Sequence, residues 1–252
     1  RKSGVTTASN KSVKEVELET LLSSKEEIGE DKPDGEFYAR AVPRSRWEKP
    51  WMTSVDRVVL AHRLREVIAQ VGFTRFEASV PDIEGELDIG VRSASLGREI
   101  SWLPAVENRG EGIFLAFNKS AIDAWLSKPE VKERGRQLLG GFIAWLDEHQ
   151  GSKRDFPGLP YIMLHSLSHL LITAVSLECG YPSSSIRERI YAGNNGYGIL
   201  LFTGSPDAEG TLGGLVEAAR QVDRHVRAAL DFGGLCSNDP VCAQHDPENK
   251  NE

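Results

Sequence analysis

The stretch from Tyr161 to Cys179 is the feature that most constrains how this chain can fold. It is followed by Gly180 and Pro182, a typical signal for the end of a helix. Its apolar residues leave little room for a solvent-exposed polar face, which predicts a central, buried helix. These apolar residues are Ile162, Met163, Leu164, Leu167, Leu170, Leu171, Ile172, Ala174, Val175 and Leu177. No run in the chain reaches the roughly 18 apolar residues that a membrane helix needs. We therefore expect a globular core and no membrane contact.

The first half of the chain predicts a mixture of helices and short strands. Apolar side chains at three-to-four spacing over residues 54–71 are typical of an amphipathic helix. Asn118 is a candidate N-cap for a second helix that carries Ala121 to Leu126, and a third helix is expected from Val131 to His149. Short strands, separated by glycine and proline, are expected around residues 75–80, 87–91, 100–103 and 113–117.

The second half predicts a helix-rich arrangement. Ser185 and Glu188 have the spacing of a capping box, which predicts a short helix in the segment SIRERIY. A strand at residues 197–202 and a glycine-rich loop then lead to a helix through about Leu230. The fold class is therefore mixed α/β (α+β), with a partly β first half and a helix-rich second half. The proline-containing linker at residues 153–160 indicates three parts: a linker-like region at 1–53, a mixed α/β domain at 54–150 and a helix-rich module at 151–252.

Charge is unevenly distributed along the 252 residues. The formal net charge of −7 argues against a protein that coats nucleic acid with its whole surface. From Arg40 to Arg75, however, eight basic residues face three acidic ones, and Trp47 and Trp51 lie among them. Arginine with aromatic residues is the composition that contacts phosphates and stacks bases. The candidate DNA contacts are Arg44, Arg46, Lys49 and Arg63; pairing of this basic segment with acidic residues of the same protein or a partner is the alternative.

Two histidines lie four residues apart in the predicted central helix. The imidazoles of His165 and His169 would face the same way, as two metal ligands do. A zinc peptidase of the H-E-x-x-H type needs a glutamate next to the first histidine, where this chain has Ser166. A satisfied polar stripe within a buried helix is therefore the favoured interpretation of the pair.

A glycine-rich loop follows the predicted strand at residues 197–202. Gly204, Gly210 and Gly213 precede a helix N-terminus, a place that favours anions, but Asp207 and Glu209 would repel a phosphate. The loop matches neither the P-loop nor the dinucleotide-binding pattern. We therefore do not expect this chain to hydrolyse ATP by itself.

Cys236 and Cys242 are the candidate metal ligands. They flank the turn SNDPV, and two thiolates in a turn are typical of half of a structural zinc site. Three cysteines in a chain of this size indicate reduced thiols and a cytoplasmic location. Ordinary free thiols are the alternative interpretation.

Several strings resemble one known family. LHSLSHLLITAVSLECGYPSSSIRERIY, GILLFTGSPDAEGTLGGLVEAA and LCSNDPVC are similar to the C-terminal module of the DrmB proteins of the DISARM anti-phage system. The MrfA-type DNA-repair helicases share that module as a zinc-binding accessory domain. Upstream, VVLAHRLREVIAQVGFTRFE and WLPAVENRGEGIFLAF resemble the preceding segment of DrmB, so the resemblance runs from Val55 to about Pro247.

The resemblance implies a non-catalytic subunit that acts with the helicase-like partner DrmA on foreign DNA. It implies a DNA methyltransferase in the same system, and zinc held first by Cys236 and Cys242, with a second ligand pair expected after Glu252. Two alternatives stay open. One is a metal-dependent hydrolase or nuclease built on His165, His169, Asp207 and Glu209; the other is the accessory domain of a DNA-repair helicase.

Overall fold

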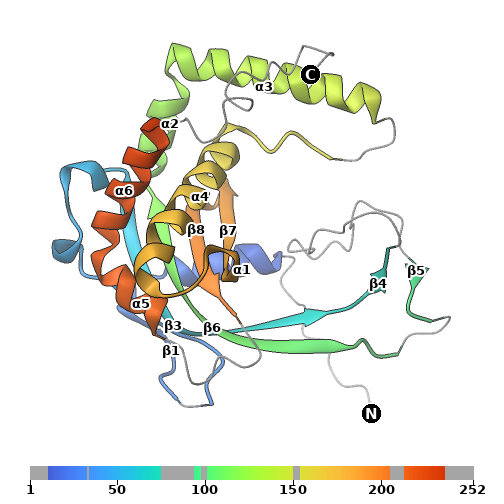
Figure 1. Ribbon diagram of the computed structural model, residues 1–252, viewed down its shortest axis with the longest axis vertical. Helices are drawn as coiled ribbons and strands as arrows, with labels where there is room; N and C mark the ends of the chain where they lie inside the picture. Colours follow the sequence, from blue (N-terminus) through green and yellow to red (C-terminus); the bar gives the residue numbers. More distant parts are fainter. Residues whose placement is uncertain are drawn as a thin grey trace.

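A computed structural model describes residues 11–32, 34–74, 94–97, 101–149, 154–204 and 213–235 of the chain. These residues form a six-stranded antiparallel sheet with helices on both faces (Figure 1). The predicted mixed α+β class is therefore confirmed.

The sheet has the strand order β1-β2-β3-β6-β8-β7. Its strands are β1 (Glu27–Gly29), β2 (Tyr38–Ala41), β3 (Val55–Ala69), β6 (Ala105–Phe117), β7 (Ile186–Gly193) and β8 (Gly196–Thr203). Strands β4 (Gly72–Phe73) and β5 (Ala94–Ser95) form a separate pair. Strand β6 pairs with β3 through Leu60↔Ile113 and with β8 through Ile113↔Leu201. The sheet thus includes strands from both sides of residue 150, and the division of the chain at that residue stays a prediction.

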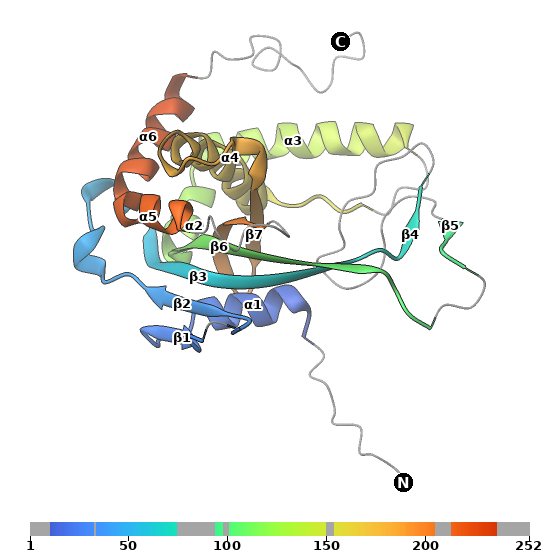
Figure 2. The same cartoon turned by 60° about the horizontal axis from the view of Figure 1, so that its bottom comes forward.

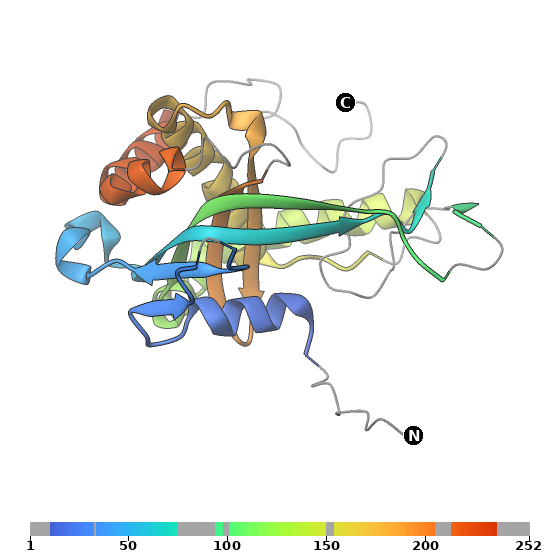
Figure 3. The same cartoon turned by 90° about the horizontal axis from the view of Figure 1, so that it is seen from below.

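The helices form a layer on each face of the sheet (Figures 2 and 3). They are α1 (Val13–Leu21), α2 (Lys119–Leu126), α3 (Pro129–Glu148), α4 (Leu159–Cys179), α5 (Gly214–Ala218) and α6 (Val222–Leu235). Helices α4, α5 and α6 cover one face and α1 covers the other. The predicted cap of α2 is confirmed, because Asn118 Oδ1 accepts from the backbone N–H of Ala121 at 3.2 Å.

The two faces of β6 support two separate apolar clusters. Ile113 and Leu115 belong to the cluster beneath α4, α5 and α6, whereas Phe114 and Ala116 belong to the cluster beneath α1. This alternation is the two-residue period of a strand that is covered on both faces. The core therefore lies on both sides of the middle of the sheet.

Helix α4 is central, as predicted, but it is only partly buried. Leu164, Leu171 and Val175 are buried against the sheet and α6, whereas Leu177 is 75% exposed and His169 faces solvent. By length and composition alone α4 is long enough to cross a membrane. Its packing on two neighbouring layers is that of the core helix of a globular fold.

The helix predicted at residues 54–71 is wrong, because this segment is the strand β3. Val58 and Leu60 face one cluster while Val59 and Ala61 face the other, so both faces of the strand are apolar. A strand covered on both sides loses the alternating pattern that distinguishes it from a helix. Register shifts at Val55/Arg57 and Ala61/Leu64 further break the two-residue period.

The helix predicted in SIRERIY is also wrong, because residues 186–193 form β7. Ile186 and Ile190 face α4, and Arg187 and Arg189 point to the opposite face, where α1 lies. The strand predicted around residues 100–103 is not found at residues 101–103. The strands predicted at 75–80 and 87–91 lie outside the described residues, whereas residues 113–117 are part of the longer β6.

Strands β3 and β6 continue beyond the sheet as a two-stranded ribbon (Figure 3). The ribbon pairs Leu64↔Gly110 through Ala69↔Ala105, past the point where β8 ends at Thr203. Exposed apolar side chains lie on this ribbon and its extension, among them Val67, Ile68, Phe73 and Trp102.

Candidate metal centre

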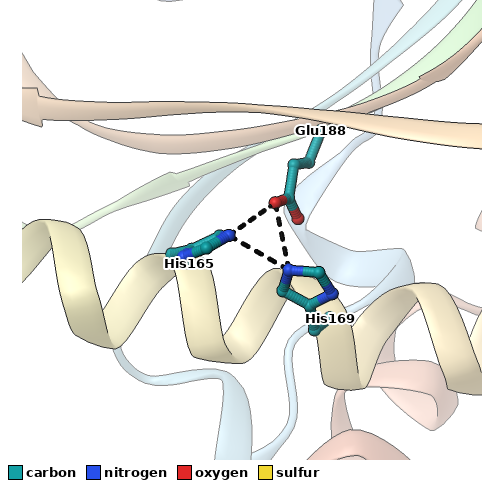
Figure 4. Close-up of side chains that lie close together, drawn as sticks. All are labelled: His165, His169 and Glu188. Atoms are coloured by element: carbon teal, nitrogen blue, oxygen red, sulfur yellow. Dashed lines mark hydrogen bonds and ion pairs between the residues drawn. The ribbon is translucent and has the colours of Figure 1, made fainter. Parts of the chain in front are cut away.

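Helix α4 and strand β7 bring together His165, His169 and Glu188 (Figure 4). The two histidines are one helical turn apart and therefore lie on the same face of α4. Glu188 comes from the face of β7 that carries Ile186 and Ile190 and packs on α4. The alternation of the strand thus points a carboxylate at the histidine pair.

The three donor atoms form a close triangle. His165 Nε2 lies 2.8 Å from Glu188 Oε1, His169 Nε2 lies 3.3 Å from the same oxygen, and the two imidazole nitrogens are 3.0 Å apart. The side chain of Glu188 is 20% exposed, whereas those of His165 and His169 are 44% and 64% exposed. The site is therefore anchored in the fold on the carboxylate side and open to solvent on the histidine side.

A buried serine orients the carboxylate. Ser168 is fully buried on α4, and its hydroxyl contacts Glu188 Oε2. The same Oγ lies 2.7 Å from the carbonyl oxygen of His165. With Oε2 engaged by Ser168, Oε1 is left to face both imidazoles.

Imidazole nitrogen and carboxylate oxygen are ligands that zinc accepts in proteins. Three protein ligands with a solvent-exposed side form the pattern of an open zinc site rather than a closed structural one. The general base of an H-E-x-x-H hydrolase is missing at its usual place, because Ser166 occupies it and donates to the Ile162 carbonyl oxygen at 2.9 Å. Asp207 and Glu209, the acids of the hydrolase alternative, lie outside the described residues.

Sequence reasoning missed Glu188 as a partner of the histidines. The spacing of Ser185 and Glu188 predicts a helix cap, whereas the Ser185 hydroxyl donates to the carbonyl oxygen of Pro182 at 2.8 Å. The alternation of Ile186, Glu188 and Ile190 was the signal that could have placed Glu188 on the α4 side of a strand.

The predicted zinc ligands Cys236 and Cys242 lie outside the described residues. The glycine-rich loop is also largely outside them, since residues 205–212 are not described. Cys179 ends α4 as a half-buried free thiol, and burial raises the pKa of that thiol.

Three of the four predicted DNA-contacting residues lie in one loop, between β2 and β3. Arg44 and Arg46 lie in a 3-10 turn, and Lys49 precedes a second turn that begins at Pro50. All three are exposed.

Arg44 pairs with Glu48 at 3.1 Å and lies 5.7 Å from the centre of the Trp47 ring. The loop is fixed to the helix layer by Trp51, whose Nε1 donates to the carbonyl oxygen of Asp223 at 2.8 Å.

Arg63 lies apart from this loop, on β3 opposite Tyr38. Its side chain is 22% exposed and faces Asp31 at 3.7 Å. Other arginines of the basic segment are similarly engaged: Arg65 contacts Glu36 and Glu107, and Arg57 donates to the carbonyl oxygen of Lys25 at 2.6 Å. Much of the basic segment is thus neutralised within the chain.

Residues 167–245 match the family model of the MrfA Zn-binding domain. The chain therefore contains a domain of a zinc-binding class, and the predicted zinc cofactor is confirmed at the level of that domain. Over 201 residues, or 78% of its length, the chain is 42% identical to the DISARM protein DrmB of Bacillus paralicheniformis. The matched part spans 35% of that protein, about a third of its length. The resemblance to DrmB is thereby confirmed.

Proposed function

We propose that this chain is part of a DISARM-type defence subunit that restricts phage in the bacterial cytoplasm. The observation that carries the proposal is the 42% identity to DrmB over 201 residues, together with the match of residues 167–245 to the zinc-binding domain. Its role in the complex is non-catalytic: it docks on a helicase subunit corresponding to DrmA and contributes to the binding of foreign DNA. A DNA methyltransferase of the same system would modify host DNA.

The architecture supports the role of a scaffold subunit more than that of an ATP-driven motor. Helices cover both faces of the sheet. The side chains on both faces of its middle strands are packed into the two apolar clusters. The sequence contains no P-loop pattern. ATP-driven movement along DNA would therefore come from the partner.

The exposed loop with Arg44, Arg46 and Lys49 is the proposed DNA contact within the assembled complex. These side chains are exposed and can reach phosphates, and Arg44 pairs with the exposed Glu48. Arg63 belongs to the same proposal but would contribute less, because it is largely buried beside Asp31. A net-negative chain with one basic loop fits a DNA path that is shared with a more basic partner.

The test is the salt dependence of DNA binding by the purified complex of this protein with its helicase subunit. The triple variant Arg44→Ala/Arg46→Ala/Lys49→Ala should bind more weakly and lower the slope of log K against log salt by up to about 0.9 per lost phosphate contact. The matched control, Lys128→Ala/Lys132→Ala/Arg134→Ala, removes the same charge from exposed residues of α3 and its cap. Equal slopes of log K against log salt for the two triple variants would show that the loop does not contact DNA.

A second measurement tests the defence role itself. Cells that carry the complete system should lose protection against phage when the gene for this protein is deleted and regain it on complementation. If the purified chain alone cleaved DNA in the presence of metal, and His169→Ala abolished the cleavage, the non-catalytic role would be wrong and the hydrolase alternative would replace it.

A further inference from the structure

We propose that His165, His169 and Glu188 bind a divalent transition metal, zinc in the first place, at a site separate from the cysteine ligands expected at Cys236 and Cys242. The ion would join α4 to β7 and leave one coordination position open to water. The inference rests on the geometry of these three residues and does not depend on the proposed defence role.

The spacing of the donor atoms fits a single ion. Tetrahedral zinc with bonds of roughly 2.0–2.2 Å to nitrogen and oxygen separates its ligand atoms by about 3.4 Å. The triangle of His165 Nε2, His169 Nε2 and Glu188 Oε1 has sides of 2.8, 3.0 and 3.3 Å. Small side-chain rotations would bring all three atoms to the zinc spacing without moving the backbone.

A proton explains this arrangement less well than a metal does. A proton on either imidazole nitrogen can bridge one pair of the three atoms, while the remaining lone pairs stay directed at one another. Two neutral rings that each carry their proton on Nε2 could both donate to Glu188 Oε1, but the two N–H groups would then crowd one oxygen, with the nitrogens 3.0 Å apart. A divalent ion accepts all three lone pairs at once.

The site is preorganised by the fold. Both histidines lie away from the ends of a 21-residue helix, and Glu188 lies on a strand that packs against that helix. Ser168 holds the other carboxylate oxygen, Oε2, and a hydrogen bond of this kind typically orients a metal-ligating group. The exposed histidine side gives an ion a direct path from solvent.

The ligand chemistry distinguishes this site from the cysteine site. Thiolates are soft ligands and typically complete closed structural zinc sites, whereas two imidazoles and a carboxylate form sites that keep an open position. The chain would then hold more than one zinc equivalent when both sites are filled. Removing either set of ligands should leave the other set able to bind.

The experiment is a metal count on the full chain. The protein is stripped with a chelator, reloaded with zinc, passed over a desalting column and analysed for bound metal. Wild type should hold one equivalent more than His169→Ala and than Glu188→Gln, while Cys236→Ser/Cys242→Ser should keep the equivalent that depends on His169. The control His149→Ala removes an exposed histidine of similar type at the end of α3 and should keep the wild-type count.

A stability measurement accompanies the count. Zinc at about 100 times its dissociation constant should raise the midpoint of thermal unfolding of wild type and of the double cysteine variant by about 5 °C or more. His169→Ala should fold, since its side chain is 64% exposed, but lose that part of the shift. Equal metal counts in wild type, His169→Ala and Glu188→Gln would overturn the site, whatever the result of the phage and DNA assays.

Discussion

The carboxylate of Glu111 on β6 accepts a hydrogen bond from the backbone N–H of Leu215, 2.8 Å away in the first turn of α5. Its second oxygen accepts from the N–H of Val216 at 3.2 Å, and Tyr181 donates its hydroxyl to the first oxygen at 3.1 Å. Glu111 is 1% exposed. A charge from the middle of the sheet therefore satisfies the free N–H groups at the beginning of a helix in the next layer, where the positive end of the helix favours an anion.

Replacing this carboxylate should destabilise the fold. In Glu111→Gln the amide still accepts from one backbone N–H, but its NH₂ group faces the other donor and leaves it unpaired. We expect a loss of about 1–3 kcal/mol in the free energy of unfolding, measured by chemical denaturation. The control Glu107→Gln changes an exposed glutamate on the same strand that pairs with Arg65 and Arg109, and it should cost clearly less, because solvent screens these pairs. Equal costs would show that the buried contacts contribute little.

The contact of Tyr181 with Glu111 makes the stability of the fold depend on pH in the alkaline range. Burial, and next the charge of Glu111, raise the pKa of Tyr181 to about 12 from an ordinary value of 10.0. The folded state thus favours the neutral phenol, and this contribution to stability is complete below pH 10 and is lost as the pH rises to about 12. Tyr181→Phe should therefore lose less stability than wild type between pH 10 and pH 12.

The measurement is urea unfolding at pH 8, 10 and 12 for both proteins. Burial also raises the pKa of Tyr191, so Tyr181→Phe should reduce the alkaline loss without abolishing it. Parallel pH profiles of wild type and Tyr181→Phe would contradict the prediction.

Helix α1 is held on the opposite face of the sheet by Glu17. Its carboxylate contacts the guanidinium of Arg189 and accepts the Tyr191 hydroxyl at 3.0 Å. Arg189 is 16% exposed, so removing Glu17 leaves a mostly buried charge with a longer contact to Glu66 at 3.5 Å and the Phe202 ring 5.4 Å away. Glu17→Ala should cost about 2 kcal/mol and speed hydrogen exchange of the α1 amides.

Glu19→Ala is the matched control on the same helix. Glu19 pairs with Lys11 at the surface, where both side chains are 48% exposed, and such a pair contributes less than about 1 kcal/mol. Exchange rates in α1 that rise equally in both variants would show that the Arg189 contact does not hold the helix.

Local sequence signals predicted the elements whose side chains meet neighbours close in the chain. Asn118 caps α2 through the N–H three residues ahead, and Gly180 ends α4 with a φ of 77°, a conformation that glycine adopts readily. The strand β8 was predicted because its run of apolar residues is short and bounded by glycine and the loop. The signals at Asn118 and Gly180 act within one helical turn and need no tertiary partner.

The errors arose where distant segments decide the structure. Residues 54–71 become a strand because β6, some fifty residues later, provides the pairing partner along its whole length. Glu188 joins the histidines only once β7 lies beneath α4, a contact that a helical interpretation of SIRERIY concealed. The histidine pair was visible from its spacing, but its third member depended on the correct secondary structure.

Gly110 marks the point where β6 leaves β8 and continues with β3 alone. A Cβ atom at this position would lie 1.5 Å from the carbonyl oxygen of Thr203, far inside contact distance. The obstacle is backbone, so no side-chain rotation can relieve it, and β6 and β8 would have to separate. Gly110→Ala should therefore lower the free energy of unfolding by about 3 kcal/mol.

Gly193, the last residue of β7 before the chain turns into β8, provides the matched control. An added Cβ there meets no atom within 4 Å among the described residues. Gly193→Ala should change stability by less than about 0.5 kcal/mol. Unfolding by urea, followed by circular dichroism, compares the two alanine variants directly. If Gly110→Ala were as stable as Gly193→Ala, the close approach of β6 to the end of β8 would be wrong, and with it the point at which the ribbon separates from the sheet.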